Sequence, residues 1–109
     1  MPTVTVSDEY TDIFAPLGDV QQAVDEALKR YAVEKISEHI ADLRRKIRAW
    51  EEEYGCSYET FYARVTADED YVTRLRQISP TWERDFQQWE FYVEELREWI
   101  ARLESISRN

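Results

Sequence analysis

The stretch from Pro80 to Ile106 constrains the fold of this chain more than any other. Its apolar residues recur at alternating steps of four and three, which is the heptad spacing of helices that pack along one seam. These residues are Trp82, Phe86, Trp89, Val93, Leu96, Ile100 and Leu103. Ser79 and Pro80 favour a helix start, and neither Gly nor Pro follows before the end of the chain. Such a helix would be about 40 Å long, so its continuous apolar stripe needs a partner.

A second tract with the same spacing comes earlier in the chain. Asp19 followed by Gln22 has the spacing of a capping box that opens a long helix, and Gly55 is expected to end that helix in a left-handed conformation. The apolar positions of the later part are Ile36, Ile40, Leu43, Ile47, Trp50 and Tyr54. An antiparallel pairing of the two tracts is the simplest way to bury both seams. The sequence leaves open whether the two tracts pair within one chain or between two chains.

Two short helices are expected between the tracts. One begins at Ser57, and Thr66 with Glu69 forms a capping box for the second, which ends near Ile78. The predicted fold class is therefore all-α: a long antiparallel helical hairpin or coiled coil with two short connecting helices and a short N-terminal strand or arm. Because the apolar register slips between Tyr31 and Ile36, we divide the chain into an N-terminal strand and helix dimerisation segment, 1–33, and a helical hairpin, 34–109, continuous with it.

The N-terminal residues Thr3–Ser7 alternate Thr or Ser with Val. This pattern predicts a short strand or an extended arm. A lone strand of this length is not stable, so it would need a strand from another chain. A short helix is expected from Asp8 to Phe14, followed by a stop at Pro16 and Gly18.

The composition limits the partners that this chain can have. The 109 residues carry a formal net charge of −9, which disfavours non-specific nucleic-acid binding by the whole chain and suits a basic protein partner. The single cysteine, Cys56, cannot form an internal disulfide, and a cytoplasmic location is expected. Neither a leader peptide nor an apolar run long enough to span a membrane is indicated.

The sequence offers no constellation that predicts catalysis. It lacks a Cys/His cluster, a Gly-rich phosphate loop and a nucleophile elbow. We therefore expect no catalytic, cofactor or metal site, and no enzyme. An enzyme accessory subunit, or a metal-binding bundle that uses the helical carboxylates, is the alternative, although the diagnostic Glu-x-x-His spacing is missing. The basic run at 44–48 is expected to pair with Glu90, Glu94 and Glu98 of the C-terminal helix, with phosphate contact as the other interpretation.

Three aromatic residues lie outside the predicted seam of the C-terminal helix. With Trp82 at heptad position d, Tyr92 and Trp99 fall in the g row beside the seam, and Phe91 falls at f, directly away from it. A large outward aromatic side chain in the middle of a helix is typical of an interface. Phe91, Tyr92 and Trp99 are therefore predicted to bind a partner. The alternative is that the g row packs on the short helices of the same chain.

Residues 3–36 resemble a ribbon-helix-helix module of prokaryotic antitoxins. The matching features are the alternating segment Thr3–Ser7, a short helix that ends near Leu17-Gly18, and a helix that follows Asp19. The resemblance implies a homodimer in which strands of two chains form a ribbon that enters the DNA major groove, with Thr3, Thr5 and Ser7 facing the bases. Unlike the strand usual in that family, this one contains neither Arg nor Lys.

Residues 36–106 are similar to small helical prokaryotic proteins of the antitoxin class. The similarity rests on residues 54–61 (YGCSYETF), which follow a long charged helix, and on residues 82–90 (WERDFQQWE), which open the last one. It implies an antitoxin-like protein that binds and neutralises a partner toxin through its C-terminal helices, with autoregulation of transcription as a further expectation. The alternative is a structural, homo-oligomeric coiled-coil protein without a toxin partner.

Overall fold

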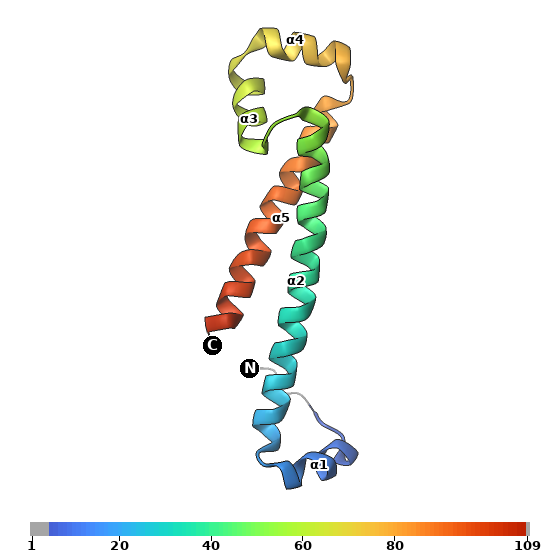
Figure 1. Cartoon of the computed structure of the whole chain (residues 1–109), viewed down its shortest axis with the longest axis vertical. Coiled ribbons are helices and arrows are strands. Elements are labelled where there is room, and N and C mark those ends of the chain that lie inside the picture. Colours follow the sequence, from blue (N-terminus) through green and yellow to red (C-terminus); the bar gives the residue numbers. More distant parts are fainter. Residues whose placement is uncertain (1–4, 109) are drawn as a thin grey trace. The chain divides into compact units, whose positions relative to one another are not determined.

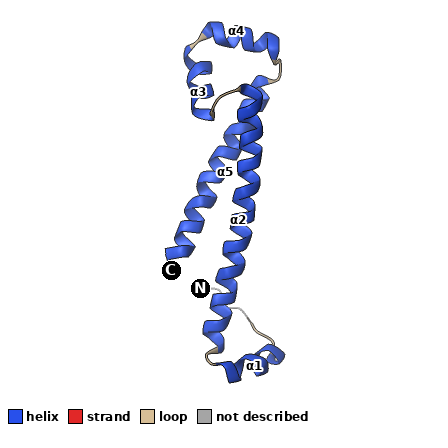
Figure 2. Ribbon diagram, in the orientation of Figure 1, coloured by secondary structure: helices blue, strands red, loops and turns tan. Residues whose placement is uncertain are grey.

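The computed structural model of the protein describes residues 5–108 (Figure 1). Helices and short loops make up this part of the chain, and none of its residues lies in a strand (Figure 2). The elements are α1 (Asp8–Phe14), η1 (Ala15–Leu17), α2 (Val20–Tyr54), α3 (Tyr58–Ala67), α4 (Glu69–Ile78) and α5 (Trp82–Arg108). The expected all-α class is confirmed. The chain divides into two units between Lys35 and Ile36, and each unit is described separately.

The first unit contains α1, η1 and the start of α2. The predicted strand is not formed over Thr5–Ser7, and Thr3 lies outside the described residues. A strand needs a neighbour for its backbone groups, and no other strand occurs among residues 5–108. Asp19 begins α2 as expected, because its Oδ1 accepts from the backbone N–H of Gln21 at 2.9 Å.

The second unit is a helical hairpin formed by the later part of α2 and by α5. Ring contacts show that the two helices run in opposite directions: Tyr54 lies 5.9 Å from Trp89, and His39 lies 4.9 Å from Trp99. All thirteen apolar residues of the two predicted seams are buried or half-buried. The two heptad tracts therefore cover each other within one chain (Figure 1).

The helices α3 and α4 connect the two long helices and close one end of the core. Ser57 caps α3 by accepting from the N–H of Thr60 at 3.2 Å, and Asp68 caps α4 by accepting from the N–H of Tyr71 at 3.0 Å. The predicted capping box at Thr66 is wrong, because α3 continues to Ala67. The Thr66 hydroxyl instead donates to a carbonyl of the preceding turn.

The start of α5 also differs from the prediction. Ser79, Pro80 and Thr81 form the connection from α4, and α5 begins at Trp82. The N–H of Ser79 closes α4 by donating to the Leu75 carbonyl at 2.7 Å. At the end of α2, Gly55 has φ +71° and donates its N–H to the Glu51 carbonyl at 2.8 Å. The predicted left-handed ending of this helix is thus confirmed.

Candidate interaction surfaces of the hairpin

An aromatic cluster fixes the closed end of the hairpin. Phe61 on α3 and Trp89 on α5 are both fully buried. The ring of Phe61 lies within 4.8–6.3 Å of five other rings, those of Tyr54, Tyr71, Trp82, Phe86 and Trp89. Heptad spacing predicted Trp82, Phe86 and Trp89 of α5 as core. The central place of Phe61 was missed, because a ten-residue helix has too few turns to show a seam.

A hydrogen-bonded group ties α2 to α5 beside this cluster. The Tyr54 hydroxyl donates to Asp85 Oδ2 at 2.6 Å and lies 3.2 Å from the Ser79 hydroxyl. Burial, and secondarily the hydrogen bond to the Asp85 carboxylate, raise the pKa of Tyr54 to about 12. The phenol therefore stays protonated and acts as a donor between the two long helices.

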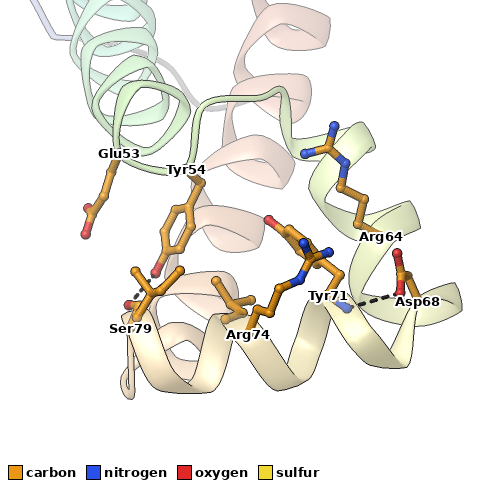
Figure 3. A pocket seen from close by; sticks show the side chains of 9 residues that line it. Glu53, Tyr54, Arg64, Asp68, Tyr71, Arg74 and Ser79 are labelled. Atoms are coloured by element: carbon orange, nitrogen blue, oxygen red, sulfur yellow. Dashed lines mark hydrogen bonds between the residues drawn. The ribbon is translucent and has the colours of Figure 1, made fainter.

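A pocket of about 630 Å³, here called the end pocket, lies at the closed end of the hairpin (Figure 3). Its walls come from the end of α2, from α3 and from the length of α4. The lining residues are Glu53, Tyr54, Arg64, Asp68, Tyr71, Arg74, Leu75, Ile78 and Ser79. No motif pointed to this pocket, because three separate elements supply its walls. The one signal that could have indicated it is the spacing of Tyr71, Leu75 and Ile78 on one face of α4, with Asp68 at the N-terminal cap of that helix.

The three predicted partner-binding aromatics have different surroundings. Phe91 is 56% exposed, whereas Tyr92 and Trp99 are half-buried. The Lys46 ammonium lies 5.2 Å from the centre of the Tyr92 ring, and His39 packs edge-on against Trp99. The g row therefore packs partly against α2 of the same chain, and Phe91 is the most solvent-exposed of the three.

Phe91 lies beside a groove between α2 and α5. The groove measures about 740 Å³, and its aromatic residues are Trp50, Phe91 and Tyr92. The other lining residues are polar: Arg84, Asp85, Gln87 and Gln88. An apolar anchor surrounded by polar side chains is the arrangement found at the centre of many protein interfaces.

Two of the three residues expected to bind DNA belong to the described part of the chain. Thr5 and Ser7 are exposed and lie outside regular secondary structure, and Thr3 lies outside the described residues.

The basic run at 44–48 of α2 does not form the ion pairs with α5 that the sequence predicted. Arg45 and Lys46 instead pair with Asp42 of their own helix at 3.2 and 3.1 Å. The hydrogen bond from Lys46, followed by that from Arg45, lowers the pKa of Asp42.

Over residues 5–108, no group of three or more His, Cys, Asp or Glu side chains is placed to hold a metal ion. No helix in this part of the chain is both long and apolar enough to cross a membrane.

Comparisons with protein families, with characterised proteins and with solved structures find no match to this chain. The fold and surfaces alone therefore define its class, an all-α protein built on an antiparallel helical hairpin.

Proposed function

We propose that this protein is an antitoxin-like binding protein without catalytic activity, whose hairpin holds and neutralises a partner toxin. The observation that carries the proposal is the exposure of Phe91 in the middle of α5, beside the groove that Trp50 and Tyr92 also line. That the partner is a toxin is the expectation from the resemblance of residues 54–61 and 82–90 to antitoxin-class proteins.

The charge of the hairpin supports a basic partner surface. Glu94 and Glu98 are exposed and follow Phe91 by three and seven residues, so all three share one face of α5. The chain as a whole carries a formal charge of −9. Acidic groups around an aromatic anchor would steer a cationic, RNA-cleaving toxin onto this face and hold its active site away from substrate.

The first unit supports a homodimer. No residue from Thr5 to Lys35 whose burial is described is fully buried. Among the side chains of this unit whose burial is described, four large apolar ones are exposed by 46–61%, namely those of Tyr10, Ile13, Leu28 and Tyr31. A second copy of the chain would cover them, and pairing of the two N-terminal segments would give Thr3, Thr5 and Ser7 the ribbon that DNA binding requires. On this basis we propose that the homodimer regulates transcription of its own gene. The proposed location of the protein is the cytoplasm.

Co-expression with the product of the neighbouring gene tests the proposal. We expect that product to co-purify with this protein and its toxicity to be suppressed. Replacement of Phe91 by Ala should weaken binding by about 30-fold or more, since such anchors contribute about 2 kcal/mol. Tyr62→Ala is the matched control, because Tyr62 is a similarly exposed aromatic on α3, at 50%. A neighbouring product that neither co-purifies nor is neutralised would overturn the proposal.

A further inference from the structure

We propose that the end pocket binds the C-terminus of a peptide, with its carboxylate on Arg64 and Arg74 and its last, bulky apolar side chain against α4 (Figure 3). The end pocket belongs to the hairpin unit but does not include Phe91 or the other residues proposed to bind a toxin. The inference therefore does not depend on the toxin partner.

The apolar part of the end pocket is a strip along one face of α4. Leu75 is buried, and Tyr54 and Tyr71 are half-buried. Ile78, in the last turn of α4, is 81% exposed. Ile78 therefore exposes much of its surface to water next to partly covered aromatic side chains. Such an apolar surface is typically covered by an apolar group of a ligand.

Two guanidinium groups give this strip a site for an anion. Arg64 lies over the Tyr71 ring, with Cζ 5.6 Å from the ring centre. Arg74 donates from Nε to the Asp70 carbonyl at 3.4 Å, which leaves its terminal nitrogens for other acceptors. Neither arginine forms an ion pair with a residue in the described part of the chain. Because the protein has 23 Asp and Glu residues but only 14 Lys and Arg residues, most cations have acidic neighbours to choose from, and two arginines without an ion pair at one pocket are unexpected.

The acidic groups of the end pocket indicate which anion fits. Asp68 already accepts from the N–H of Tyr71 as the cap of α4, and Glu53 lies on the opposite wall (Figure 3). Two carboxylates would repel a phosphate dianion more strongly than a single carboxylate. A guanidinium binds a carboxylate through two parallel hydrogen bonds. A monoanionic carboxylate attached to an apolar group therefore matches the lining best.

The polar groups of the end pocket favour a peptide over a fatty acid as the source of the carboxylate. A volume of about 630 Å³ accommodates the terminal residues of a peptide. The Ser79 hydroxyl shares its contact with Tyr54 and retains capacity for a peptide amide or carbonyl. A fatty acid would leave this polar wall without partners.

Calorimetric titration of the full chain tests the proposal with defined probes. Acetyl-Ala-Leu with a free carboxylate should bind, and its C-terminal carboxamide should bind about tenfold or more weakly, because the charge-assisted hydrogen bonds are lost. Arg64→Gln and Arg74→Gln should each weaken binding of the free acid by about tenfold. Arg76→Gln, on the same helix but outside the end pocket, is the matched control, and Phe91→Ala should bind like the wild type.

Three results would overturn the proposal. The first is equal affinity for the acid and the carboxamide, or no binding of either at millimolar concentration. The second is tighter binding of inorganic phosphate or octanoate than of the peptide acid, which would assign the site to another anion. The third is an equal loss of affinity in Arg76→Gln, which would show a general charge effect. Circular dichroism of each variant verifies that the hairpin remains folded.

Discussion

At the residue scale, Phe61 is the side chain on which the closed end of the hairpin depends most. It is fully buried and contacts rings from α2, α4 and α5. Its truncation to Ala should lower the free energy of unfolding by about 3–5 kcal/mol, since the rigid ring neighbours cannot collapse into the cavity. Tyr62→Ala, one residue away and half exposed, should cost less than about 1 kcal/mol. Urea denaturation followed by circular dichroism measures both, and equal losses would contradict this role of Phe61.

A second prediction at this scale concerns pH and Tyr54. The folded state raises the pKa of Tyr54 from 10.0 to about 12 by burial and by the bond to Asp85. A raised pKa means that the protonated phenol stabilises the folded state below pH 10 and that this contribution is lost as the pH rises towards 12. The advantage of the wild type over Tyr54→Phe in unfolding free energy should therefore shrink between pH 10 and 12. If the difference in unfolding free energy between the wild type and Tyr54→Phe stays constant over this range, the raised pKa of Tyr54 is contradicted.

At the scale of elements, the caps decide where the short helices begin. Asp68→Ala should destabilise the hairpin by about 1 kcal/mol, because the N–H of Tyr71 loses its acceptor. Thr66→Ala should have a smaller effect, since the Thr66 hydroxyl only donates to carbonyls within α3. Thermal unfolding of the two variants compares them directly. A larger loss of stability in Thr66→Ala than in Asp68→Ala would support Thr66 as the capping residue of α4, as the sequence predicted.

The long helices could be predicted from the sequence because their pattern repeats over many turns. Seven apolar positions in α5 and six in α2 mark the seams, and Gly55 marks the end of α2 by its need for positive φ. The boundaries of α4 and α5 could not be predicted as well. Thr66 and Asp68 are both good capping residues two positions apart, and only tertiary packing decides between them.

The candidate sites were predictable to a smaller extent, for a physical reason. Heptad position f places Phe91 away from the seam in any two-helix arrangement, and Phe91 is exposed. The exposure of aromatic residues in the g row is harder to predict, because a charged or polar side chain of the facing helix can cover an aromatic ring at this position. Lys46 and His39 do so for Tyr92 and Trp99. The end pocket depends on how three helices meet, which spacing along one helix cannot specify.

At the scale of the whole molecule, the two units differ in how much they bury. The hairpin unit has a core that includes Phe61, Leu75, Trp89 and Val93. In the first unit, no residue of Thr5–Lys35 with a described side chain is fully buried. Because helix stability in proteins comes mainly from packing of an apolar face, the hairpin should be stable in a single chain, and the first unit should gain stability from whatever covers Tyr10 and Tyr31.

Hydrogen exchange on the full chain tests this difference. Amides of α1 and of the first turns of α2 should exchange much faster than those of the hairpin in dilute protein, since local opening there exposes little buried surface. Raising the protein concentration should slow exchange in α1 and around Tyr31, because association stabilises by mass action only the segment that the second copy covers. The amides around Leu43 and Trp89 should not respond, because their partners lie within the same chain. Concentration-dependent protection of the hairpin instead would mean that the two chains associate through α5, and the surface proposed for the toxin would then be the dimer interface.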